Sequence, residues 1–124
     1  MKRILLCSVL FLAGCVHSGQ IATPLPAGAI NQLDATTNSL LQTAHAFAAR
    51  ISSAVQSTDS NIHIELSATQ KGLLNALNRS LNIADPLEQA YHASGTPSSA
   101  SALQAAANDV QSKLTAAQNG IGVK

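Results

Sequence analysis

Residues 30–54, INQLDATTNSLLQTAHAFAARISSA, decide the fold class of this chain. Mostly apolar residues return in this stretch at alternating spacings of three and four: Ile30, Leu33, Thr37, Leu40, Ala44, Phe47, Ile51 and Ala54. This pattern is the a and d stripe of a heptad, sustained over about four repeats, and it predicts an amphipathic helix that packs along other helices. Asp34 lies in its first turns and Arg50 in its last ones, which suits the helix dipole. The loop-forming sequence TDSN at residues 58–61 predicts that the helix ends near Ser57.

A second helix is predicted after a short connection. Residues 62–66 alternate apolar and polar side chains, but so short a segment without a partner strand forms no sheet. Residues 67–70, SATQ, have the pattern of a capping box, in which the side chains of Ser67 and Gln70 satisfy amide groups at the start of a helix. The inner stripe that follows consists of Leu73, Leu77, Ala84, Leu87 and Tyr91, widened by Leu74 and Leu81.

Pro86 leaves two interpretations of this second helix open. An interior proline removes one backbone hydrogen bond and clashes with the preceding turn. Asp85 could therefore cap a fresh short helix, with Pro86 at the first helical position. Alternatively, one helix continues from Ala68 to Ser94 with a kink near the proline. We favour the continuous, kinked helix, because it would nearly match the first helix in length.

A third helix is predicted after the sequence Gly95-Thr96-Pro97, which combines a helix-ending glycine with a helix-starting proline. Its stripe consists of Leu103, Ala107, Val110, Leu114, Ala117 and Ile121. Asp109 and Lys113 form a helix-supporting pair, and Asn119-Gly120 is expected to end the helix. Three such helices joined by short connections predict an all-α domain over residues 29–124, folded as an antiparallel three-helix bundle.

The N-terminus carries a different kind of signal. Lys2 and Arg3 precede the apolar run 4–12, which leads into the sequence Leu12-Ala13-Gly14-Cys15. The run is too short to cross a bilayer, which takes roughly 20 apolar residues. This order of parts resembles the signal and lipobox of bacterial lipoproteins. A plain secretory signal with a chance cysteine is the alternative, since the small residues before Cys15 would also suit another peptidase.

The resemblance to bacterial lipoproteins implies an anchored mature chain. Residues 1–14 would be removed as a signal peptide, and Cys15 would carry fatty acyl chains such as palmitate. Residues 15–28, with their prolines and glycines, would tether the domain to the lipid surface. Val16 stands where some lipoproteins have the aspartate that retains them in the inner membrane, which favours the outer membrane and a domain that faces the periplasm.

Composition excludes several classes of protein. The cysteines are Cys7, inside the expected signal, and Cys15, so the domain itself has no thiol for a disulfide or a metal site. Without Lys2 and Arg3, five of the seven basic side chains remain against six acidic ones, a side-chain charge of −1 for the mature chain. The charges are dispersed and aromatic residues are scarce, which argues against nucleic-acid binding.

No residue pattern names a reaction. His17, His45, His63 and His92 form no pair at i, i+4 and are predicted to be polar surface residues, with His45 at the rim of the first helix stripe. The sequence His63-Ile64-Glu65 matches part of a deaminase zinc motif, but the paired cysteines of that motif are missing.

The remaining polar and aromatic residues also have simpler explanations than chemistry. Glu65, Asp85 and Glu88 form no obvious acid and base pair, and helix capping explains the last two. Neither a Gly-x-Ser-x-Gly elbow nor a glycine-rich phosphate loop occurs. Phe47 and Tyr91 are predicted to fill the core. We therefore predict no catalytic, cofactor-binding or metal-binding residue, and lipidation of Cys15 is the one site assigned.

These observations favour a non-enzymatic cell-envelope lipoprotein that serves as a structural or protein-interaction module. Its expected partners are the membrane, through the lipid, and a protein or a second copy of the chain, but no nucleic acid and no small-molecule substrate. A phage- or plasmid-encoded envelope lipoprotein, such as an exclusion factor or a lysis partner, is the first alternative. A small enzyme or metal carrier is the second.

Overall fold

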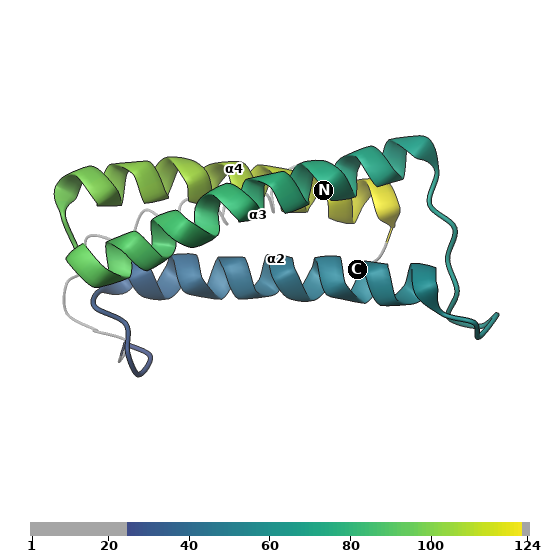
Figure 1. Ribbon diagram of the computed structural model, residues 1–124, viewed down its shortest axis with the longest axis horizontal. Coiled ribbons are helices and arrows are strands. Elements are labelled where there is room, and N and C mark those ends of the chain that lie inside the picture. The colour runs from purple at the N-terminus through teal and green to yellow at the C-terminus, as the bar shows by residue number, and fades with distance from the viewer. Residues whose placement is uncertain (1–24, 123–124) are drawn as a thin grey trace, which may run out of the picture.

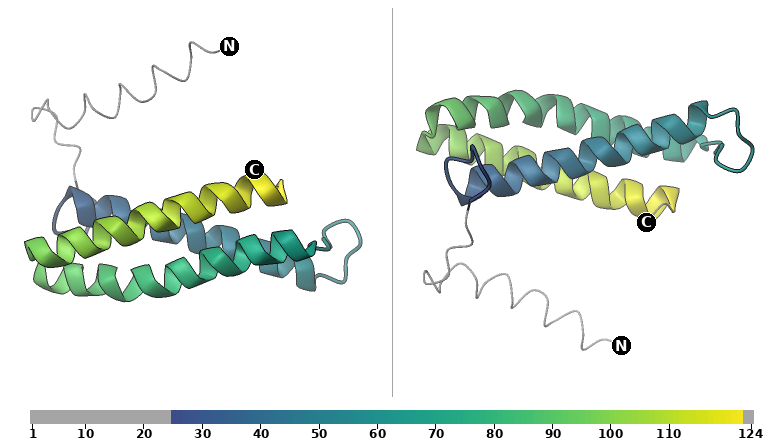
Figure 2. Two further views of the ribbon diagram at one scale, coloured as in Figure 1. Left: turned by 90° about the horizontal axis from the view of Figure 1, so that it is seen from above. Right: turned by 90° about the horizontal axis from the view of Figure 1, so that it is seen from below.

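The computed structural model describes residues 25–122, and within this range it contains three α-helices and no strand: α2 (Gln32–Gln56), α3 (Ala68–Ser94) and α4 (Pro97–Ile121). The helices pack against one another, with α3 antiparallel to both α2 and α4 (Figures 1 and 2). The predicted all-α, antiparallel three-helix bundle is confirmed. No helix in residues 25–122 combines the length and apolar character that a membrane span needs. The expected signal peptide, Cys15 and most of the expected tether lie outside the described residues.

Helix α2 ends near Ser57 as the sequence predicts, but it begins after Ile30, the exposed first residue of the predicted stripe, and its buried face is broader than one stripe. The side chain of Asn31 caps the start by accepting a hydrogen bond from the Asp34 amide at 3.0 Å. Thr37, Ala44, Phe47 and Ile51 are buried as predicted, whereas Asp34, Ala35, Leu41 and Ala48, outside the predicted stripe, are buried as well. Because α2 packs against both α3 and α4, two adjacent stripes of its surface are covered.

Helix α3 starts with the predicted capping box and runs through Pro86 without ending. The Ser67 amide donates to Gln70 Oε1 at 2.9 Å, and the Gln70 amide donates to Ser67 Oγ at 3.2 Å. The alternative of a fresh helix at Asp85 is therefore wrong, and so is the explanation of Asp85 and Glu88 as capping residues, since both lie inside the helix. Pro86 is exposed, so water can satisfy the carbonyl that loses its amide partner.

Helix α4 extends further than the sequence predicts. It starts as expected after Gly95, which has the left-handed φ of 59°, with Thr96 as the N-cap and Pro97 in the first turn. The prediction that it ends at Asn119-Gly120 is wrong, because the helix continues to Ile121 and is capped by Gly122 at a φ of 73°. Gly120 instead allows a close approach of α3, since a Cβ atom at this position would clash with Leu73.

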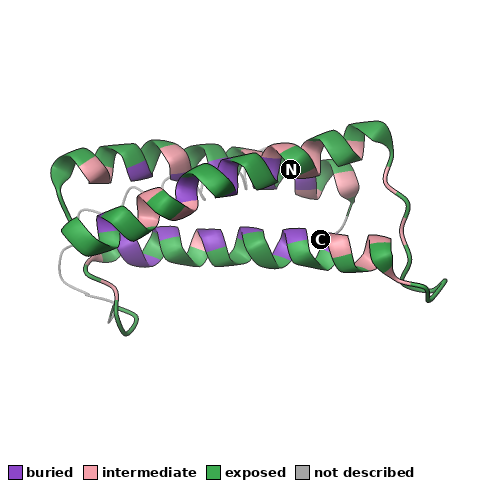
Figure 3. Ribbon diagram, viewed as in Figure 1, coloured by how far each residue is buried: buried purple, intermediate pink, exposed green. Residues whose placement is uncertain are grey.

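The core lies along the axis of the bundle, where the inward faces of the three helices meet (Figure 3). The predicted stripes of α3 and α4 supply their share of it, and Phe47 and Tyr91 are buried as predicted. The buried cluster consists of Leu41, Ala44, Phe47, Ala48, Ile51, Leu77, Leu81, Ala84, Val110, Leu114 and Ala117. Polar contacts fix the register of the helices: Ser80 Oγ on α3 donates to Asp109 on α4, and Asn31 Nδ2 donates to the Tyr91 hydroxyl at 2.6 Å.

Candidate functional site

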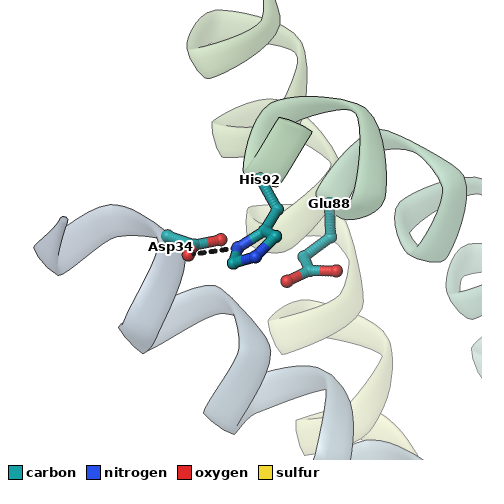
Figure 4. A group of neighbouring side chains, drawn as sticks. All are labelled: Asp34, Glu88 and His92. Atoms are coloured by element: carbon teal, nitrogen blue, oxygen red, sulfur yellow. Dashed lines mark hydrogen bonds and ion pairs between the residues drawn. The ribbon is translucent and has the colours of Figure 1, made fainter. Parts of the chain in front are cut away.

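Three polar side chains meet where the start of α2 lies beside the end of α3. Asp34 is in the first turn of α2, and Glu88 and His92 are one turn apart near the end of α3 (Figure 4). The antiparallel arrangement of the two helices brings these distant parts of the sequence together. We refer to Asp34, Glu88 and His92 as the polar triad.

Asp34 is an unusual core residue, because only 2% of it is exposed. Its Oδ2 atom accepts a hydrogen bond from the Ile30 amide at 2.9 Å and another from His92 Nδ1 at 2.7 Å. Its other oxygen, Oδ1, is buried and has no hydrogen-bond partner among the described residues. An unsatisfied buried polar atom costs about 1 to 3 kcal/mol, and more when charged, so packing stability alone does not explain this carboxylate.

The pKa values of all three side chains of the polar triad are shifted. Burial by itself would raise the pKa of Asp34, but the hydrogen bonds from Ile30 and His92 and the charge of His92 outweigh it, and the pKa lies below its usual value. The hydrogen bond to Asp34, followed by the attraction of that carboxylate, raises the pKa of His92. Burial, followed by repulsion from Asp34, raises the pKa of Glu88. The site therefore combines two carboxyl groups with one imidazole.

A solvent-accessible hollow of about 450 Å³ opens beside the polar triad. The backbone turn that precedes α2 forms one wall, and the two helices form the others. Its lining consists of Pro26, Ala27, Gly28, Ala29, Asp34, Ala35, Asn38, Glu88, Gln89 and His92. One potential ligand atom from each triad residue lies within 4.8 Å of the other two. An imidazole nitrogen and two carboxylate oxygens at this spacing, next to a hollow, can hold a cation or exchange a proton.

The other residues considered in the sequence lie apart from the triad. His45 on α2 contacts both carboxylate oxygens of Asp85 on α3, at 3.0 and 2.9 Å, and about half of its side chain is exposed. His63 is exposed and its Nδ1 contacts the Ser57 carbonyl at 2.9 Å, while Glu65 is exposed in the same loop. The prediction that His45, His63 and His92 are surface residues is confirmed, but the sequence does not predict that His45 contacts Asp85 and His92 contacts Asp34. His17 lies outside the described residues.

Part of the polar triad could have been found in the sequence. Glu88 and His92 are spaced i, i+4, which places two side chains on one face of a helix. An acid and a histidine at this spacing can bind a cation as a pair of histidines can. In the sequence, the position of Asp34 indicates only a residue that suits the helix dipole, because its burial depends on the packing of the helices. No local pattern indicates it.

The chain matches no protein-family model, and its comparison with curated proteins and with solved structures also gives no match.

The link between Asp34 and His92 predicts a pH-dependent contribution to stability. The folded pKa of His92 is raised, so this contribution is complete below the unfolded value of about 6.5 and is lost as the pH rises through the folded value. The folded pKa of Asp34 is lowered, so its contribution is present above about 3.9 and is lost as the pH falls through the folded value. The pair stabilises the fold most between these limits.

We therefore expect His92→Gln to lower the melting temperature most at about pH 5 to 6 and much less at about pH 8.5. Thermal unfolding followed by circular dichroism, with wild type and variant compared at each pH, measures the difference. Glu88 interacts electrostatically with His92 and with Asp85, and both carboxyl groups are present in the two proteins, so the difference reports the link between His92 and Asp34. A difference in melting temperature that stays constant or grows toward alkaline pH would contradict this linkage.

Proposed function

We propose that the protein is a non-enzymatic lipoprotein of the bacterial cell envelope, anchored through Cys15, and that its helical bundle binds another protein. The sequence Leu12-Ala13-Gly14-Cys15 after a short apolar run supports the anchor. The packed bundle that follows supports a domain that functions outside the lipid. The observation that carries the proposal is an exposed apolar surface at the end of the bundle remote from the expected anchor.

The two ends of the bundle differ in their relation to the anchor. The chain enters the described residues at Leu25, beside the start of α2 and at the same end as the turn between α3 and α4 (Figure 1). The loop between α2 and α3 lies at the opposite end. Helix α2 has 25 residues, so the two ends are separated by roughly 37 Å. A chain anchored through Cys15 can thus present that loop away from the lipid surface.

This remote end combines exposed and concave apolar surface. Ile62 in the loop is 58% exposed. Beside it is a hollow of about 690 Å³ whose lining includes Ile51, Ile62 and Ile64 and the charged residue Arg50. An exposed apolar side chain beside a partly apolar depression, with an arginine nearby, is a feature of protein-binding surfaces. Confinement to a membrane raises the effective concentration of such a binder.

Site-specific photocrosslinking in the native envelope tests this proposal. A photoreactive amino acid at position 62 is expected to crosslink the protein to a distinct partner, identified by mass spectrometry of the crosslinked band. The matched control is position 98, where Ser98 is exposed at the opposite end of the bundle in the first turn of α4. Crosslinking of the chain only to itself would replace the partner by a second copy. Equal yields at positions 62 and 98, or no crosslinked band, would contradict a binding surface at the remote end.

A further inference from the structure

We propose that Asp34, Glu88 and His92 form a binding site for a divalent transition-metal ion of the zinc class. The site lies between α2 and α3 at the end of the bundle nearer the expected anchor, so it is separate from the surface proposed to bind a partner. The inference does not depend on the anchor or on the partner. It follows from the contacts of the three side chains.

The ligand types favour zinc over the harder cations. Imidazole nitrogen suits zinc, copper, iron and nickel, whereas magnesium and calcium prefer oxygen ligands alone. Glu88 and His92 project from the same face of α3, and Asp34 completes the set from α2 (Figure 4). Three protein ligands next to an open hollow leave a coordination position for water, as in zinc sites that are not closed by a fourth side chain.

The unpartnered oxygen of Asp34 supports a bound cation independently of the ligand types. Asp34 is buried to 2% exposure, and its side chain points toward His92 (Figure 4), yet Oδ1 has no hydrogen-bond partner among residues 25–122. A metal ion bound by this carboxylate would satisfy the buried charge that the protein leaves unsatisfied.

Electrostatics also favours a divalent cation here. With neutral His92, the two carboxylates carry a charge of −2, which a divalent ion neutralises. His92 lies in the last turn of α3, where the helix dipole attracts cations. Binding of the ion to a protonated His92 releases one proton to solvent, so zinc affinity should fall as His92 becomes protonated.

The contact between His45 and Asp85 joins the same two helices and serves as a comparison for the polar triad. His45 Nε2 engages both oxygens of Asp85, and the two side chains are 52% and 33% exposed. Among residues 25–122, no third His, Cys, Asp or Glu lies close enough to His45 and Asp85 to complete a metal site with them. The polar triad differs in its buried carboxylate, Asp34, and in its third potential ligand, Glu88, which makes His45→Gln a matched control for its variants.

Zinc titration by isothermal calorimetry tests the proposal. The full-length chain is purified in detergent with Cys7, Cys15 and His17 replaced by serine, so that no thiol or imidazole outside residues 25–122 binds zinc. We expect one zinc ion per chain at about pH 7.5, with much weaker binding of magnesium and calcium. Glu88→Gln and His92→Gln should each weaken zinc binding by at least about tenfold. His45→Gln should leave the affinity within about twofold.

Glu88→Gln is the decisive variant, because the Glu88 side chain makes no hydrogen bond among the described residues. If the triad is only an ion pair, this change removes repulsion from Asp34 and has no effect related to zinc. If the triad binds zinc, the variant melts at an equal or higher temperature than wild type without zinc, but loses the rise in melting temperature that zinc produces. Absence of zinc binding by wild type, zinc binding unaffected by Glu88→Gln, or equal binding of zinc and magnesium would overturn the proposal.

Discussion

Replacement of Phe47 by alanine is expected to lower the free energy of unfolding by about 3 to 5 kcal/mol. Phe47 belongs to the buried cluster between the three helices and is 8% exposed. Its removal takes away the largest apolar side chain that α2 contributes to the core and leaves a cavity that the neighbouring side chains fill only in part. For a small domain this is a large share of the total stability.

Urea denaturation of the unlipidated chain from residue 15 to 124, followed by circular dichroism, measures this loss. Ile83→Ala is the matched control, because Ile83 on α3 is 59% exposed, and we expect a change within about 0.5 kcal/mol. If Phe47→Ala is unfolded without urea, Phe47→Leu should still fold and show a smaller loss. Similar losses for Phe47→Ala and Ile83→Ala would show that the stripe of α2 faces outward and that the bundle is wrong.

Local patterns were sufficient to predict the helices, because each helix is amphipathic and begins or ends at a residue with a local function. Ser67 and Gln70 form their capping box within four residues, and Gly95 ends α3 through its own left-handed backbone. The end of α4 could not be predicted in this way. Gly120 resembles a helix terminator in the sequence, but it lies inside the helix where Leu73 of α3 packs closely. The glycine at position 120 is explained by its contact with Leu73, which is distant in the sequence.

The same distinction explains the polar triad. Spacing along α3 places Glu88 and His92 on one face, and that part can be predicted from the sequence. Asp34 joins them because α2 packs against two helices, so that its buried face extends beyond the predicted stripe. The predicted stripe contains Leu33 and Leu40, which are only half-buried, whereas Asp34 and Leu41 are buried. A heptad pattern identifies roughly which side of a helix is buried, but it does not decide which of two neighbouring residues is the buried one.

The substitution Cys15→Ser is expected to abolish lipid attachment. This is the second large expected effect, and it tests most directly the proposal that the protein is a lipoprotein. Cells that express the protein are grown with labelled palmitate, and the purified chain is assayed for label and for partition into a detergent phase. The resemblance to a lipobox places the acyl chains on this thiol, and two or three acyl chains make attachment effectively permanent.

Cys7→Ser is the matched control for this measurement, since Cys7 is the other cysteine of the chain and lies within the expected signal peptide. Wild type and Cys7→Ser should incorporate the label and partition into detergent, and Cys15→Ser should do neither. Label that persists in Cys15→Ser, or a wild-type chain that incorporates none, would contradict the assignment of the protein as a lipoprotein.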